Sequence, residues 1–141
     1  MKQLLFGLLV FLNLILVFGQ TQTNQNVLGK YRLNWIASGF FPADDLLFEK
    51  TAEDGQYVFE FKEDGSFVQH LTAETFGECP VGVFVLEKGF WNLEKGKLSL
   101  KMKGEKLADY TFEYEIVYQI KKEKGKLRLL VDKILTNKEV K

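Results

Sequence analysis

Residues Asp109 to Lys121 read DYTFEYEIVYQIK, and this stretch decides the fold. Every second side chain from position 110 to position 120 is aromatic or aliphatic, whereas most side chains between them are polar or charged. Successive side chains of a β-strand point to opposite faces of a sheet, so a period of two predicts a strand with one apolar face. The segment therefore indicates a sheet that buries one side and exposes the other.

The same alternation recurs along the chain. Lys30 to Ile36, Lys97 to Lys103 and Lys126 to Asp132 each carry apolar side chains at every second position. A further strand is expected from Val81 to Leu93, with a bulge or bend near Lys88-Gly89, where glycine interrupts the pattern. Short Glu-Lys-Gly turns at positions 94–96 and 123–125 separate neighbouring strands.

The segment from Gln56 to Thr72 predicts a hairpin whose register depends on its turn. A three-residue loop, Glu63-Asp64-Gly65, would use Gly65 at the position with positive φ and would place Phe61 opposite Phe67. A two-residue Asp-Gly turn would pair Phe61 with Val68 instead. We favour the three-residue loop because it aligns the aromatic faces of the two strands.

Seven to eight antiparallel strands in this length can form a sandwich or a barrel. The short loops favour an all-β fold in which an antiparallel up-and-down meander closes into a β-barrel. One helical turn is expected within Pro42 to Lys50, because Pro42 suits a helix start and Asp44 and Asp45 suit the first turn. The last segment, Lys133 to Lys141, closes the sheet as a short strand or trails off.

The N-terminus has the features of a secretory signal. Leu4 to Phe18 is an uncharged, mostly apolar run behind a single lysine, and Val17 and Gly19 are small residues suited to cleavage after Gly19. The run is shorter than the about 20 residues that a membrane-spanning helix needs. We expect an exported protein, periplasmic or extracellular and soluble after cleavage, with three parts: a signal peptide at 1–19, a flexible lead-in at 20–27 and a β-barrel domain at 28–141.

Composition excludes several functions. Nineteen basic residues balance nineteen acidic ones, so the sequence offers no overall positive field for nucleic acid. One cysteine, Cys79, and one histidine, His70, do not supply a Cys- or His-based metal site, and we expect no metal, no cofactor and no enzymatic activity. Cys79 does not follow the cleavage site, so a lipid anchor is not expected. The lysine-rich turn from Lys121 to Lys126 is a solvated basic edge or a contact for anionic lipid headgroups.

Five segments, taken together and in order, resemble the bacterial lipocalin-like domain family, whose exported members are largely uncharacterised. They are Leu28-Gly29-Lys30-Tyr31-Arg32-Leu33, the hairpin from Tyr57 to Phe67, Gly89-Phe90-Trp91-Asn92-Leu93, Gly96-Lys97-Leu98-Ser99-Leu100, and Tyr114-Glu115-Ile116-Val117. The Gly-x-Trp that opens lipocalins is Gly29-Lys30-Tyr31 in this chain. The resemblance implies a lipocalin-like β-barrel whose binding function, if it has one, lies inside.

Two functions follow from these patterns. The first is a non-enzymatic binding protein for a small hydrophobic or amphipathic molecule held inside the barrel, because a few polar groups on an apolar lining orient such a guest. Its expected ligand-binding residues are Tyr31, Trp35, Phe59, Phe61, Gln69, Trp91 and Tyr114. The second is an envelope structural or protein-interaction module whose barrel is filled by its own side chains, since an eight-stranded barrel has little spare room.

The segment from Ser38 to Lys50 is a long loop rich in apolar side chains, and this surface must be covered. We consider three roles for it: a lid over the open end of the barrel, a permanent plug, and a patch that meets a protein partner. The expected lid residues are Phe40, Phe41, Leu47 and Phe48.

Overall fold

The protein is described by a computed structural model over residues 27–55, 57–72, 84–106 and 110–141. Within these ranges, eight antiparallel strands form one nearly closed, barrel-shaped sheet, so the expected all-β class is confirmed at the upper end of the expected strand number. The predicted signal peptide, Cys79 and most of the predicted lead-in lie outside the described residues. Val27, the last residue of that lead-in, is fully buried in the core.

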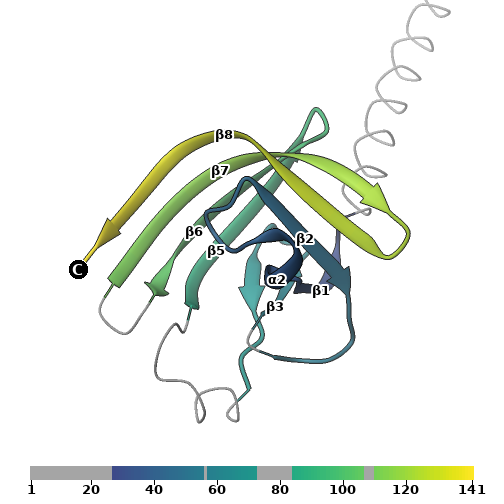
Figure 1. Ribbon diagram of the computed structural model, residues 1–141, viewed down its shortest axis with the longest axis horizontal. Helices are drawn as coiled ribbons and strands as arrows, with labels where there is room; N and C mark the ends of the chain where they lie inside the picture. The colour runs from purple at the N-terminus through teal and green to yellow at the C-terminus, as the bar shows by residue number, and fades with distance from the viewer. Residues whose placement is uncertain (1–26, 56, 73–83, 107–109) are drawn as a thin grey trace, which may run out of the picture.

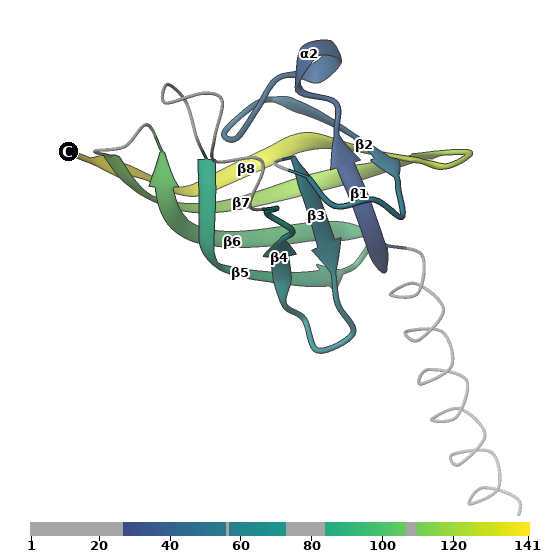
Figure 2. The ribbon, with the colours of Figure 1, turned by 90° about the horizontal axis from the view of Figure 1, so that it is seen from below.

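The elements are β1 (Gly29–Leu33), α2 (Trp35–Ser38), β2 (Asp45–Lys50), β3 (Val58–Phe61), β4 (Phe67–Gln69), β5 (Phe84–Glu94), β6 (Lys97–Lys106), β7 (Tyr110–Glu123) and β8 (Lys126–Val140). Their order in the sheet is β4-β3-β1-β2-β8-β7-β6-β5. Strands β5 to β8 are long and run side by side as a curved meander, and the shorter strands β1, β3 and β4 cross them (Figures 1 and 2). The barrel therefore encloses its core between a long and a short half.

The predicted meander describes only part of this order. Strands β5 to β8 pair with their neighbours in sequence, as expected, through two-residue turns at Lys95-Gly96 and Lys124-Gly125. Strand β1, however, lies between β2 and β3, and β2 pairs with β8. The meander of β5 to β8 curves, so that its last strand, β8, pairs with β2. Because β1 lies between β3 and β2, the strand order is not that of a simple up-and-down barrel.

The register of the β3–β4 hairpin is the predicted one. Phe61 lies opposite Phe67 and Phe59 lies opposite Gln69, and Gly65 adopts a φ of 81°. The predicted irregularity in β5 is also present, because the pairing with β6 shifts between Leu86 and Lys88. Gly65 makes the hairpin turn possible, because glycine adopts a positive φ without steric cost.

The expected helical turn within Pro42 to Lys50 is wrong. The helical turn lies at Trp35–Ser38, where the Asn34 side chain accepts a hydrogen bond of 3.1 Å from the Ala37 N–H and caps it. The segment Asp45–Lys50, which we expected to contain a helical turn, is strand β2, because Leu46 and Phe48 alternate into the core. Arg128 on β8 donates three hydrogen bonds of 2.9, 3.1 and 2.5 Å to Asp45, which lowers the pKa of that carboxyl.

The barrel closes between β4 and β5. The Gln69 side-chain amide donates to the Phe84 carbonyl at 2.9 Å, and its oxygen accepts from the Leu86 N–H at 2.7 Å. The Trp91 N–H donates to the Gly65 carbonyl at 2.8 Å. Side-chain and backbone hydrogen bonds thus join two edges that would otherwise expose unpaired groups.

Strand β8 is longer than expected, and the residues from Lys133 to Val140 continue it against β7. Two register shifts leave Asp132 and Leu135 as extra residues on β8. Strand β2 covers β8 only as far as Leu130, so the remaining part of β8 is a sheet edge within the described ranges. Bulges and lysines on an edge hinder pairing with another strand.

We predict that Gly89→Ala destabilises the fold by about 2 kcal/mol or more, because the added methyl group would collide with the Phe67 carbonyl oxygen at the β4–β5 closure. The free energy of unfolding in urea measures this. Gly55→Ala is the matched control, because its methyl group would lie 3.6 Å from a Val58 methyl group, an ordinary contact. Equal, small effects at both positions would contradict the closure.

Candidate functional site

The interior of the barrel contains most of the predicted ligand-binding residues. Tyr31, Phe59, Phe61 and Tyr114 are each at most 2% exposed, and Trp91 is 8% exposed. Their rings contact one another or other core rings: the Tyr31–Phe61 centroid distance is 5.9 Å and the Phe61–Trp91 distance is 5.8 Å, both edge to face. The structure therefore brings these five residues together as packed core side chains.

The other two predicted ligand-binding residues lie elsewhere. Trp35 was expected to point inward from a strand, but it begins helix α2 and is 46% exposed, because β1 ends at Leu33 and Asn34 caps the helix. Gln69 uses its side-chain amide to close β4 on β5. Trp35 is thus outside the barrel, and Gln69 joins the two edges of the sheet.

The expected lid residues separate into inner and outer positions. Phe41 and Phe48 are buried, and Phe41 packs its ring on Phe84 at 5.6 Å and on Phe59 at 5.7 Å. Phe40 is partly buried against Phe84, and Leu47 is partly buried on strand β2. Of the three roles considered for this loop, the packing of Phe41 is that of a plug.

Two tyrosine hydroxyls on the inward face of β7 differ in their surroundings. The Tyr114 hydroxyl donates to the Glu139 carboxylate, which also accepts from Lys106 at 2.9 Å. These hydrogen bonds lower the pKa of Glu139, and burial together with Glu139 raises the pKa of Tyr114. The Tyr118 hydroxyl is buried and has no hydrogen-bond partner among the described residues, and burial raises its pKa.

His70, the single histidine, lies on the outside of the barrel between acidic side chains. Its Nε2 is 2.8 Å from a Glu60 carboxylate oxygen and its Nδ1 is 3.5 Å from an Asp54 oxygen. Lys30 also contacts Asp54, at 2.5 Å. The cluster ties β1, β3 and the end of β4 together, and among the described residues no group of three or more His, Cys, Asp and Glu side chains is placed to hold a metal ion.

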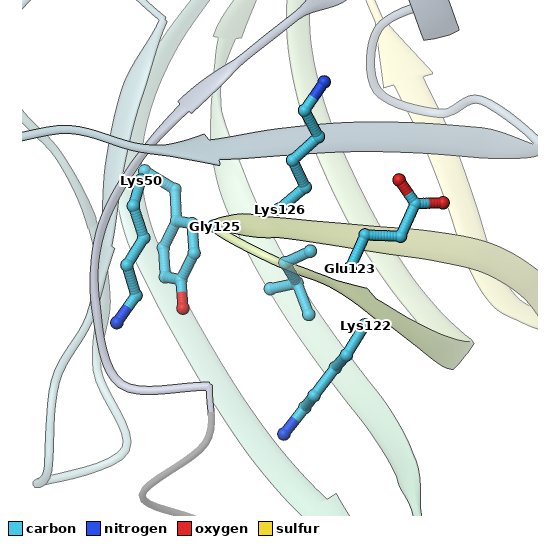
Figure 3. A pocket seen from close by; sticks show the side chains of 7 residues that line it. Lys50, Lys122, Glu123, Gly125 and Lys126 are labelled. Carbon is cyan, nitrogen blue, oxygen red and sulfur yellow. The ribbon is translucent and has the colours of Figure 1, made fainter.

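Beside the β7–β8 turn lies a hollow of about 150 Å³ that we call the Tyr31 hollow, lined by Tyr31, Lys50, Lys122, Glu123, Gly125, Lys126 and Leu127. Lys50 is opposite Tyr31 in the β1–β2 pair, and its ammonium group lies 5.8 Å from the centre of the Tyr31 ring. The amino ends of Lys50 and Lys122 point to the same side, whereas Lys126 and Glu123 point the other way (Figure 3). Two cations and a tyrosine therefore share one open site.

Sequence reasoning missed this site, although Tyr31 was among the expected residues. Lys50 and Lys122 fall at positions where the strand alternation points inward, in line with Phe48 and Tyr118. A lysine at an inward position of an otherwise apolar strand face could have been noticed in each sequence segment. Only the pairing of β2 with β8 and of β8 with β7 brings the two lysines to one hollow.

Comparison of the chain with protein-family models, curated proteins and solved structures finds no match. Within the described residues, no helix has the length and apolar character that crossing a membrane requires.

We predict that Tyr118→Phe stabilises the protein by about 1 kcal/mol, because it removes a buried hydroxyl that has no partner in the described ranges. Tyr114→Phe is the matched control and should not stabilise, because its hydroxyl donates to a carboxylate. Thermal unfolding of the two variants measures the difference. A destabilising Tyr118→Phe would mean that this hydroxyl has a hydrogen-bond partner in solution, such as an internal water or a guest.

Proposed function

We propose that the protein is an exported, non-enzymatic interaction module of lipocalin-like build, whose barrel is filled by its own side chains. The observation that carries this proposal is the packing of the interior. Phe41, Phe59, Phe67 and Phe84 contact one another ring to ring in the space where a carrier would hold its guest. Of the two functions expected from the sequence, this packing favours the second.

A module of this kind needs a surface for its partner, and the tip of helix α2 supports one. Ile36 is 81% exposed and Trp35 is 46% exposed, next to each other on a turn that projects from the sheet (Figure 2). The Trp35 ring packs on Tyr57 at 5.7 Å, and Tyr57 packs on Phe40 at 5.5 Å. Exposed aromatic side chains that are held in place by packing against other rings are typical of the residues that dominate protein interfaces.

The exposed apolar residues at the far end of β7 and β8 are less suitable. Ile134, Leu135 and Val140 lie on an edge strand that has two bulges and carries Lys133 and Lys138. These features protect an edge against pairing. We therefore assign the partner surface to Trp35 and Ile36, and expect a protein partner with an apolar groove.

We predict that the mature chain, purified from an exporting host, has its bare mass in native mass spectrometry, because the interior is occupied. Organic extraction and denatured mass spectra complete the comparison. A stoichiometric guest of a few hundred daltons would contradict the filled barrel and would favour the carrier function instead.

The partner surface is tested separately by site-specific photo-crosslinking in the native host. A crosslinker at Ile36 should label one defined protein, and Trp35→Ser should abolish this labelling without unfolding the chain. The same crosslinker at Phe90, an exposed aromatic residue on β5, is the matched control. Equal labelling from both positions, or labelling that survives Trp35→Ser, would contradict the assignment.

A further inference from the structure

The Tyr31 hollow contains hydrogen-bond donors without acceptors. Within the described part of the chain, the ammonium groups of Lys50 and Lys122 have no ion-pair partner and the Tyr31 hydroxyl has no hydrogen-bond partner. Lys126, the third lysine of the hollow, contacts the Glu49 carboxylate. Two of the three lysines that line the hollow therefore have no ion-pair partner in the described part of the chain.

Tyr31 gives the hollow a fixed donor. Its side chain is 2% exposed, and its ring is held edge to face against Phe61. Burial raises the pKa of the hydroxyl, so the group keeps its proton and can donate it to an acceptor in the hollow. A hydroxyl on a ring that the core holds in place, in the lining of an open hollow, is well placed to bind a ligand atom.

The two lysines supply the charge. Lys50 and Lys122 point to the same side of the hollow, and the Glu123 carboxylate points to the other side (Figure 3). Lys126 is engaged by Glu49 at 3.1 Å, so it is not a free cation. Partial desolvation lowers the pKa of Lys122. An anion bound in the hollow would raise this pKa again, because it stabilises the charged ammonium group.

We propose that the Tyr31 hollow is a binding site for the phosphate group of a small molecule or a lipid head group. A phosphate monoester carries up to two negative charges and three acceptor oxygens, which match two ammonium groups and one hydroxyl donor. The hollow, at about 150 Å³, is smaller than the pockets of about 300–1,000 Å³ that hold drug-sized ligands. It therefore accommodates a head group and leaves the rest of the ligand in solvent.

The site is independent of the proposed partner surface. Trp35 and Ile36 lie on helix α2, whereas the hollow is formed by β1, β2 and the β7–β8 turn. A chain that binds phosphate here without any protein partner, or the reverse, would separate the two proposals.

Phenyl phosphate is the probe, titrated into the ¹⁵N-labelled mature chain and followed at the amides of Lys50 and Gly125. We expect saturable shifts, and the double variant Lys50→Gln/Lys122→Gln should weaken binding by about tenfold or more. The control pair Lys103→Gln/Lys138→Gln removes the same charge elsewhere and should weaken binding by less than about twofold at physiological salt. Equal weakening by both pairs would overturn the proposal.

One further variant and two analogues of the probe test which groups the hollow recognises. Tyr31→Phe should weaken the binding of phenyl phosphate by about threefold, because the variant lacks the hydroxyl donor. Unchanged amide shifts outside the hollow verify that each variant folds. Phenol, the uncharged analogue, should not bind, and benzoate should bind more weakly than phenyl phosphate; tighter benzoate binding would overturn the assignment to phosphate. No saturable shift up to about 20 mM phenyl phosphate would overturn the site altogether.

The source of the phosphate is separated with vesicles. Phosphatidylcholine vesicles with and without phosphatidic acid are mixed with the chain and sedimented. Co-sedimentation that needs phosphatidic acid and is lost in Lys50→Gln/Lys122→Gln assigns the site to a lipid head group. Binding of soluble phenyl phosphate without co-sedimentation assigns it to a small phosphorylated molecule.

Discussion

The contact of β4 with β5 is the constraint on which the rest of the structure depends. A sheet of eight strands has two edges, and each edge exposes backbone groups that must be paired or protected. Here the Gln69 amide binds the backbone of β5, and Gly89 leaves room for the Phe67 carbonyl. Because the sheet closes at this point, its apolar face becomes an interior.

Closure also determines what the interior can hold. An eight-stranded barrel is just wide enough for its own side chains or for one small ligand. This chain places phenylalanine at many inward positions, and the first loop adds Phe41 to them. The proposed binding surfaces therefore lie outside the closed core, at the tip of helix α2 and in the Tyr31 hollow.

The sequence predicted the strands better than their order. Strict alternation in β7 and the glycine at position 65 determine local geometry, so the long strand and the hairpin register were both predicted correctly. Strand β2 was missed because adjacent leucines and two aspartates fit a helical turn as well as a strand. The place of β1 between β2 and β3 depends on pairing between distant segments, which no local pattern encodes.

In the candidate sites too, features that depend on local pattern were predicted and features that depend on strand pairing were not. Tyr31, Phe59 and Tyr114 were correctly expected to point inward, because inward position follows from alternation. Trp35 was not placed correctly, because the alternation continues past the residue at which Asn34 ends the strand and caps a helix. Lys50 and Lys122 line one hollow only because β2, β8 and β7 lie side by side, and this arrangement exists only in the folded sheet.

Hydrogen exchange at two amides tests the closed barrel most directly. The Leu86 N–H donates to the Gln69 side chain and the Trp91 N–H donates to the Gly65 carbonyl, so both depend on β4 meeting β5. We expect both amides to be protected nearly as strongly as those between β6 and β7, and to lose protection together in Gly89→Ala. Fast exchange at both amides in the unmodified chain would show that the barrel is open between β4 and β5.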